Sequence, residues 1–250
     1  MDQQWIRLET VDSTNIYAKA LARQGAPHGT VVLADCQTGG RGRMGRSFSS
    51  PKGLGIYCSV ILRPHGEPSK LLHLTAMMAE AARRAVAEAA GLNPMVKWVN
   101  DLVVNGKKLC GILTEMGLKG AETDYVIVGV GINCNQKTED FPAELQDMAT
   151  SLALELGKDV DREQIAAALV KQIMLAAEDL LTDSMPWMDS YRDHCITLGK
   201  DVQLIRNGEV RLGFAEDMDD TGALQVRLAD GSLEMIGSGE VSVRGLYGYL

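Results

Sequence analysis

The stretch from Gly39 to Arg46 constrains the fold more than any other part of the sequence. It reads GGRGRMGR, so eight residues contain four glycines and three arginines. Glycine at this density disfavours both a helix and a ladder strand, so the stretch is predicted to be a loop. Its glycines allow close approach to a ligand, and its arginines are planar, permanently charged donors suited to carboxylate and phosphate oxygens. The loop is therefore a candidate anion-binding clasp. The alternative is a solvated, mobile basic loop that only connects two elements, which would have the same composition.

The charge of the whole chain favours the clasp interpretation. The chain has 25 lysines and arginines against 33 aspartates and glutamates, a net charge of -8. Three clustered arginines are unusual in such an acidic chain. The same balance argues against a broad nucleic-acid surface, which needs net positive charge, so no DNA partner is expected.

Length and composition indicate a soluble globular protein. The 250 residues are 46% hydrophobic, and no apolar run approaches the roughly 20 residues that cross a bilayer. The chain opens without a signal peptide, so we expect a cytoplasmic protein with no membrane partner. The five cysteines form no C-x-x-C pair and the four histidines are scattered, which argues against a disulfide framework and a zinc site.

Hydrophobic periodicity predicts an α/β fold with a mixed sheet. Strands are expected at 5–9, 30–36, 54–63 and 125–133, and helices at 16–25, 68–91, 142–183 and 187–194. The clasp is then an excursion between two strands. Ser13, Thr14 and Asn15 lie at the first helix's N-terminus and exceed what one cap needs, which favours a polar ligand there over capping alone.

A β-hairpin with a polar entry is predicted around Asn105-Gly106, a type I′ turn signal. Lys97, Asn100, Asp101 and Lys108 lie among its apolar residues. Their burial is costly unless they are paired or contact a ligand, whereas a solvated surface hairpin would need neither. Farther on, two glycines in the strand 125–133 permit close approach of a flat group, or mark a bulge.

The pattern of hydrophobic and polar residues changes after Leu198. Short alternating runs broken by Asn-Gly, Asp-Asp-Thr-Gly and Asp-Gly predict a small antiparallel barrel. We therefore expect two domains, a larger one over 1–196 and a small one over 197–250.

Five motifs in order resemble those of the bacterial biotin protein ligases. They are Ser-Thr-Asn at a helix start, Gln followed by Gly-Arg-Gly-Arg-x-Gly, Lys-Trp-x-Asn-Asp, Lys-Leu-x-Gly-Ile-Leu-x-Glu, and Gly-x-Gly-Ile-Asn. The resemblance covers essentially the whole chain. It implies a mixed sheet backed by helices, similar to class II aminoacyl-tRNA synthetases, with a C-terminal SH3-like β-barrel.

The resemblance also implies a role for each matching residue. A biotin-binding set comprises Ser13, Thr14, Asn15, Gln37, Gly40, Arg41, Gly42, Arg43, Lys108, Gly111, Gly129 and Gly131. An ATP-binding set comprises Arg41, Arg43, Phe48, Lys97, Asn100, Asp101, Asn133 and Arg244. Arg43, Lys97 and Lys108 are the expected catalytic residues, and Asp101 is the expected Mg²⁺ ligand.

The implied activity is ATP-dependent formation of biotinyl-5′-AMP, followed by transfer of biotin to a lysine of a biotin carboxyl carrier domain. That domain would belong to acetyl-CoA carboxylase or a related carboxylase, and a homodimer is possible. Cations and backbone N–H groups suit this chemistry, which needs no protein nucleophile. A lipoate-type ligase and a non-catalytic biotin sensor are the alternatives. Retention of Lys97, Asp101 and Lys108 argues against the sensor.

The sequence departs from relatives in three places. The catalytic region begins at about residue 4, so we expect no N-terminal DNA-binding domain. Phe48 stands where some relatives have tryptophan, and Met44 where some have a third arginine. The stacking and the charge of the closed clasp are therefore expected to differ from theirs.

Overall fold

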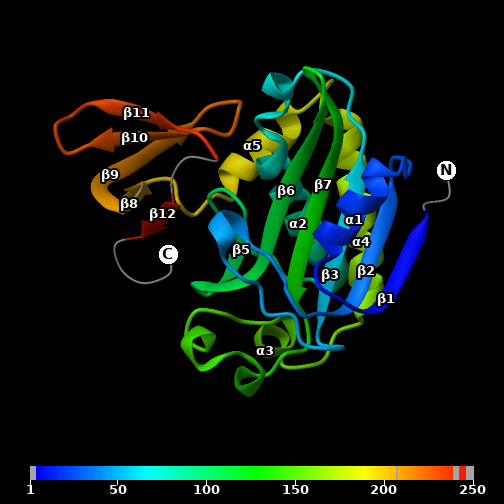
Figure 1. Ribbon diagram of the computed structural model, residues 1–250. Coiled ribbons are helices and arrows are strands. Elements are labelled where there is room, and N and C mark those ends of the chain that lie inside the picture. Colours follow the sequence, from blue (N-terminus) through cyan, green and yellow to red (C-terminus); the bar gives the residue numbers. More distant parts are fainter. Residues whose placement is uncertain (1–3, 207, 239–241, 246–250) are drawn as a thin grey trace.

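The computed structural model describes residues 4–206, 208–238 and 242–245, with only the backbone of Ser242, Arg244 and Gly245. A seven-stranded sheet has the order β1-β2-β3-β7-β6-β5-β4 (Figure 1). Only β1 and β2 pair in parallel, so the sheet is mixed as predicted. Its strands are β1 (Trp5–Val11), β2 (Thr30–Gln37), β3 (Gly55–Leu62), β4 (Met95–Lys97), β5 (Asp101–Val104), β6 (Lys107–Lys119) and β7 (Glu122–Asn133).

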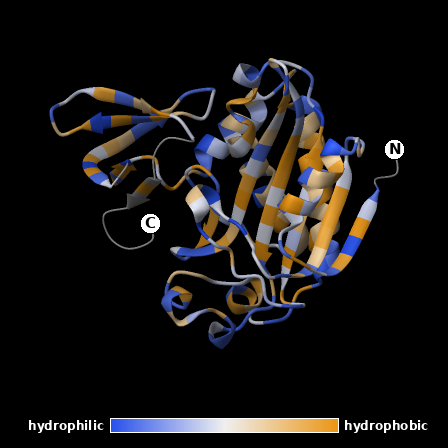
Figure 2. Cartoon of the chain, in the orientation of Figure 1, coloured by the Kyte–Doolittle hydropathy of each residue, from blue (hydrophilic) through white to orange (hydrophobic). Residues whose placement is uncertain are grey.

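Helices cover both faces of this sheet, but unequally. They are α1 (Thr14–Arg23), α2 (Leu74–Ala90), α3 (Leu152–Leu156), α4 (Arg162–Asp179) and α5 (Met185–Asp193). Alternate residues of the strands, among them Val60 and Val128, pack with α2, α4 and α5 in the main core, whereas Ile61 and Ile127 pack with α1 in a smaller cluster. Figure 1 shows α1 on the side of the sheet opposite α2 and α4, and Figure 2 shows the hydrophobic strands between them.

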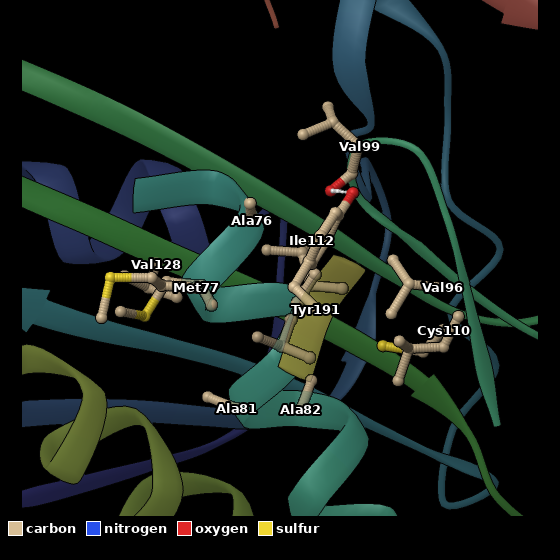
Figure 3. Packing of buried hydrophobic residues seen from close by; sticks show 14 of the residues in the cluster. Ala76, Met77, Ala81, Ala82, Val96, Val99, Cys110, Ile112, Val128 and Tyr191 are labelled. Atoms are coloured by element: carbon tan, nitrogen blue, oxygen red, sulfur yellow. Dashed lines mark hydrogen bonds between the residues drawn. The ribbon is translucent and has the colours of Figure 1, made fainter. Parts of the chain in front are cut away.

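Tyr191 of α5 ties the helical layer to the β4–β5 region. Its ring is fully buried beside Ala81 and Ala82 of α2, and its hydroxyl donates to the carbonyl of Val99 at 3.2 Å (Figure 3). Burial raises the pKa of this phenol well above its ordinary value. The hydroxyl therefore stays a neutral donor, and it holds the backbone next to Asn100 in place.

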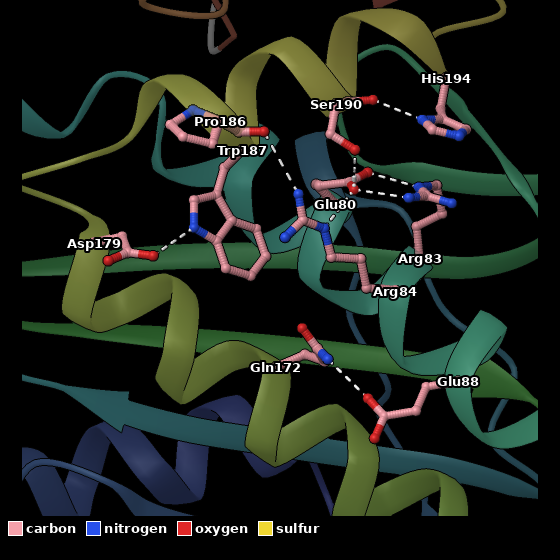
Figure 4. A network of polar contacts seen from close by, with 10 residues as sticks. All are labelled: Glu80, Arg83, Arg84, Glu88, Gln172, Asp179, Pro186, Trp187, Ser190 and His194. Atoms are coloured by element: carbon pink, nitrogen blue, oxygen red, sulfur yellow. Dashed lines mark hydrogen bonds and ion pairs between the residues drawn. The ribbon is translucent and has the colours of Figure 1, made fainter.

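A buried carboxylate joins α2 to α5. Both oxygens of Glu80 accept from the Arg83 guanidinium, and one of them also accepts from Arg84 and from the hydroxyl of Ser190, at 2.6–2.8 Å (Figure 4). Burial opposes its charge, but these donors hold the pKa of Glu80 below its ordinary value. The fully satisfied charge fixes the position of α5.

The hairpin turn predicted at Asn105 and Gly106 is confirmed. Asn105 and Gly106 both have positive φ, 48° and 79°, as a type I′ turn requires. Asp161 caps α4 by accepting from the backbone N–H groups of Glu163 and Gln164.

The prediction of helix over 142–183 was wrong before α3, at 142–151, and between α3 and α4, at 157–161. Residues 143–145 form a single 3₁₀ turn and residues 146–148 a further turn. Ala149 then forms a parallel bridge with Lys108 of β6, because Lys108 donates its backbone N–H to Met148 and accepts from Thr150. These tertiary hydrogen bonds replace the local helical ones.

The C-terminal region forms a five-stranded antiparallel sheet of order β11-β10-β9-β8-β12. It comprises β8 (Lys200–Arg206), β9 (Glu209–Met218), β10 (Leu224–Leu228), β11 (Leu233–Ile236) and β12 (Ser242–Gly245). Trp98 Nε1 donates to the carbonyl of Gly222 at 2.9 Å, and Arg192 of α5 donates to Met218. The small sheet is therefore docked beside α5 and the β4–β5 region (Figure 1). Among the described residues, no helix combines the length and apolarity needed to cross a membrane.

Candidate active site

A cavity of about 350 Å³ lies on the face of the sheet that carries α1. Most predicted site residues line it: Ser13, Thr14, Asn15, Gln37, Arg41, Gly42, Arg43, Phe48, Lys97, Asn100, Asp101, Lys108, Gly111, Gly129 and Gly131. They come from the start of α1, the end of β2, the clasp, the β4–β6 hairpin and β7. The fold thus gathers all five motifs around one space.

Uncharged polar groups form one end of the cavity. Gln37 Oε1 accepts from the backbone N–H of Thr14 at 2.9 Å and from its hydroxyl at 3.1 Å. Gln37 Nε2 donates to Ser50, whose hydroxyl donates to the carbonyl of Phe48. Thr14 is buried and Gln37 is half-buried, and the two side chains are already joined by hydrogen bonds in the protein alone.

Asn15 spans three strands at this end. Its Nδ2 donates to the carbonyl of Leu113 at 3.2 Å and to Glu115 Oε2 at 3.0 Å, both on β6. Its Oδ1 accepts from the hydroxyl of Ser59 on β3 at 2.6 Å. Burial opposes the charge of Glu115, but hydrogen bonds from Asn15 and Lys19 keep its pKa below the ordinary value. Glu115 is consequently an ionised acceptor.

The glycines of β7 make room for protein side chains. A Cβ at Gly129 would lie 2.0 Å from Asn15 Oδ1, and one at Gly131 would lie 2.5 Å from the ring of Phe48. The same ring lies 3.5 Å from the Cβ position of Gly111. The flat group for which these glycines leave space in this structure is thus Phe48. The sequence also allowed these glycines to mark a β-bulge. No bulge occurs at them, since β7 pairs with β3 in unbroken register through both glycines.

Charged groups form the other end of the cavity. Lys108 Nζ lies 2.7 Å from Asp101 Oδ1, and Lys97 is buried and is the ladder partner of Asp101. Asn100 Nδ2 donates to the carbonyl of Ile112 at 2.8 Å, which fixes its amide. Charges that would be costly to bury alone are therefore paired, as the hairpin's composition required.

The clasp folds over the charged end. Arg43 donates to Asn100 Oδ1 at 3.0 Å and to the carbonyl of Ser238, which follows β11 of the C-terminal sheet. Burial lowers the pKa of its guanidinium, which nevertheless remains charged. Arg41 lies 3.8 Å from Glu115. The predicted loop contains one 3₁₀ turn, Arg43–Gly45, with Met44 at φ 55°.

Two predicted residues do not line the cavity, and the side chain of a third is not described. Gly40 is a buried residue of the clasp itself, where a Cβ would be 2.4 Å from the carbonyl oxygen of Phe48. Asn133 is buried outside the cavity, and its Nδ2 donates to the carbonyl of Thr150 at 2.9 Å. The side chain of Arg244 lies outside the described residues.

Sequence reasoning missed several residues at the site. Ser59, Glu115 and Trp98 contact predicted site residues or line the cavity, as do Arg46, Ser47, Ile112, Leu113, Val130, Met148 and Val243. Ser59 is the one aliphatic hydroxyl in the largely apolar run Ile56–Leu62, which marks it as unusual but does not show what it contacts.

The cysteines have no place in this chemistry. Cys58, Cys110 and Cys134 are buried, and burial raises the pKa of Cys58 and of Cys134 to about 12. They remain thiols and pack in the core. Among the described residues, no group of three or more His, Cys, Asp or Glu could hold a metal ion.

Comparison with known proteins agrees with this arrangement. Residues 8–133 match the biotin/lipoate A/B protein ligase family, and residues 197–244 match the biotin protein ligase C-terminal domain. The chain is 38% identical over 236 residues to the bifunctional ligase/repressor BirA of Bacillus spizizenii, covering 92% of this chain and 71% of that protein. It is 32% identical over 247 residues to the biotin–[acetyl-CoA-carboxylase] ligase of Mycobacterium tuberculosis, covering 95% and 89%.

A solved structure gives the same result. The Aquifex aeolicus biotin protein ligase in complex with biotin and ATP superposes with a TM-score of 0.82 and 31% identity, covering 98% of this chain and all of that one. The fold and the cavity thus define a member of the biotin/lipoate A/B protein ligase family, to which this chain belongs. Within that family it falls among the biotin protein ligases, and the lipoate-type and non-catalytic alternatives are not favoured.

Proposed function

We propose that this protein joins biotin to ATP, giving biotinyl-5′-AMP and pyrophosphate, and then transfers biotin to a lysine of a biotin carboxyl carrier domain. One observation carries the proposal: a single cavity has uncharged hydrogen-bonding groups at one end, and Lys97, Lys108 and Arg43 at the other. Biotin has the matching polarity, with a cyclic urea at one end and a carboxylate at the other. The complex of the Aquifex ligase with biotin and ATP supports both substrates.

In the first step, a biotin carboxylate oxygen bonds to the α-phosphorus of ATP, and the bond to pyrophosphate breaks. Lys108 and Lys97 lie where negative charge would accumulate on the carboxylate and phosphoryl oxygens. Because both are fixed on strands, they stabilise that charge without reorganising. Arg43 adds a planar donor from the clasp and closes the cavity against water.

Asp101 is the residue that would hold Mg²⁺. Mg²⁺ favours oxygen ligands, and in nucleotide sites it is commonly bound by one or two carboxylates together with substrate phosphates. A single carboxylate beside the phosphate-facing lysines fits that pattern. Bound there, the ion would neutralise charge on the ATP phosphates. Its arrival would also compete with Lys108 for Asp101.

In the second step, the acceptor amine forms a bond to the acyl carbon of the mixed anhydride, and AMP leaves. The M. tuberculosis relative's name points to acetyl-CoA carboxylase as the source of the acceptor. We assign the two steps to residues 1–196, with residues 197–250 as a separate domain that helps close the site through Ser238 and Arg244.

The test is to incubate the full chain with Mg²⁺, ATP, biotin and a biotin carboxyl carrier domain, and then weigh the carrier. We expect one biotinyl addition per carrier, with AMP and pyrophosphate released. Lipoate replaces biotin in a parallel reaction. A lipoyl addition without a biotinyl one would overturn the proposal in favour of the lipoate-type ligase, and binding of biotin without AMP release would favour a sensor.

A further inference from the structure

Ser59 is buried at the uncharged end of the cavity, between two residues of α1. Its side chain is fully excluded from solvent, with Oγ 2.6 Å from Asn15 Oδ1 and 2.8 Å from Thr14 Oγ1. A hydroxyl has one proton, so it can donate to only one of these oxygens. Which of them receives the proton determines what the cavity offers to a ligand.

The surroundings of Asn15 settle the question. Its Nδ2 faces two acceptors, the Leu113 carbonyl and the carboxylate of Glu115, so the amide oxygen must face Ser59. An amide oxygen only accepts. Ser59 therefore donates its proton to Asn15, and its own oxygen becomes an acceptor toward Thr14.

Thr14 is then surrounded by acceptors within the protein. Its hydroxyl has Ser59 Oγ at 2.8 Å and Gln37 Oε1 at 3.1 Å, and it must give its proton to one of them. What remains at Thr14 Oγ1 is lone-pair density in a residue that lines the cavity. Thr14 is thereby prepared to accept a hydrogen bond from a ligand N–H.

An independent observation shows that this arrangement is built into the sheet. Gly129 is the ladder partner of both Ser59 on β3 and Leu113 on β6. A Cβ at Gly129 would lie 2.0 Å from Asn15 Oδ1. The absent side chain at Gly129 is what lets Asn15 lie across β7 from Leu113 to Ser59.

We propose that Ser59 is a positioning residue that fixes the hydrogen-bond polarity of this end of the cavity, so that it presents acceptors to the N–H groups of a cyclic urea. The proposal rests on the proposed function, since biotin supplies that urea. Ser59 acts through Asn15 and Thr14 and does not take part in the phosphoryl or acyl chemistry. Glu115 is the fixed acceptor that sets the direction of the whole chain of hydrogen bonds.

The main test is Ser59→Ala. We expect the Kd for biotin, measured by calorimetry without ATP, to rise about tenfold, the equivalent of one hydrogen bond. The KM for ATP and the kcat at saturating biotin should be unchanged. A merely structural role would not give this division between the two substrates.

A second measurement uses biotin methylated on a ureido nitrogen, which has lost one N–H. The wild-type protein should discriminate strongly against this analogue, and Ser59→Ala should lose much of that discrimination because its acceptors are no longer fixed. Gly129→Ala should reproduce both effects by displacing Asn15. The control is Thr30→Ala, which removes another buried hydroxyl at the far end of β2, where Thr30 donates to Pro27.

Equal losses of biotin and ATP binding in Ser59→Ala, or unchanged biotin affinity and discrimination, would overturn the proposal. If Ser59→Ala does not fold, the same measurements on Ser59→Cys decide, because the thiol fills the position but donates weakly. Failure of the proposed function has a different signature, since the wild-type protein would then bind no biotin.

Discussion

The two faces of the seven-stranded sheet use the same strands for different purposes. On β7, Val126 and Val128 point into the core beneath α2 and α4, while Gly129 and Gly131 open onto the cavity. One face is held together by close-packed apolar side chains, and the other by interlocked hydrogen bonds and ion pairs around a space. Because neighbouring residues of a strand face opposite sides of the sheet, one residue can contribute to stability and the next to ligand binding.

This division predicts that substitutions will affect either unfolding or catalysis, but seldom both equally. A ligand-binding face needs glycines and polar groups, which contribute little apolar burial. The helical face compensates with a continuous core from β3 across to α5. Each substitution below tests whether the two faces are as separate as their composition implies.

The largest effect is expected from Glu80→Ala on the helical side. The substitution leaves the buried Arg83 guanidinium without its carboxylate, and breaking a buried pair in this way costs about 3–5 kcal/mol of unfolding free energy. Denaturant unfolding would measure the loss. The control is Glu88→Ala, which removes a carboxylate of the same helix that pairs with Lys171 in solvent and accepts a hydrogen bond from Gln172 (Figure 4). Similar losses in both variants would contradict the role given to Glu80.

Glu80 also predicts how stability depends on pH. Its pKa in the folded protein is held below the ordinary 4.5 by the two arginines and Ser190. Its stabilisation is therefore complete above about pH 4.5 and is lost as the pH falls through the lower, folded value. In Glu80→Gln this part of the acid slope should disappear, and an unchanged slope would show that other carboxylates cause it.

On the cavity face, Lys108→Ala should have the opposite effect to Glu80→Ala, with a large loss of rate and little loss of stability. Loss of one preorganised cation at the reacting oxygens should slow adenylate formation about 10²- to 10³-fold. The melting temperature should change little, because the Lys108–Asp101 pair is partly exposed and such pairs contribute little to stability. The adjacent Lys107→Ala is the control, since Lys107 does not line the cavity. Rates are measured by pyrophosphate release, and equal rates for the two variants would contradict the assignment.

Much of this division could be predicted from the sequence, because motifs fix local chemistry. The order of strands, the clasp between β2 and β3, and the residues of the hairpin all follow from glycine density, turn residues and periodicity. Ser59 and Glu115 could not be assigned in this way, since their roles arise only when β3 and β6 meet across β7. Residues 142–151 were mispredicted because tertiary hydrogen bonds with β6 override their helical pattern.

The clasp allows a smaller effect to be tested at the edge of the cavity. Arg43→Gly should weaken retention of the adenylate about ten- to hundredfold, because it removes a charge-assisted hydrogen bond that forms only when the loop is closed. Rapid filtration would measure adenylate release, and biotinylation of added serum albumin would report its escape. Lys52→Ala removes a nearby exposed cation as a control. A collapse of adenylate formation without faster release would place Arg43 in the chemical step.

The smallest effect is expected from replacing a buried tryptophan. Two such tryptophans, one beside the cavity and one in the helical layer, allow a direct comparison of the two sides of the molecule. Trp98 and Trp187 are each 4% exposed, and each donates its Nε1–H, the first to Gly222 in the C-terminal sheet and the second to Asp179 in the helical layer. Replacing either by Phe removes that donor, at a cost of about 1 kcal/mol in stability.

The two variants should differ in kinetics. Trp98 lines the cavity and anchors the C-terminal sheet, and Ser238, which follows β11 of that sheet, accepts from Arg43. Trp98→Phe should therefore raise the KM for ATP and speed adenylate release, whereas Trp187→Phe should change only the melting temperature. Unaltered kinetics in Trp98→Phe would mean that docking of the C-terminal sheet and closure of the clasp are independent. A kinetic defect in Trp187→Phe would show instead that the helical layer reaches the cavity, through α5 and the Tyr191 hydrogen bond to Val99.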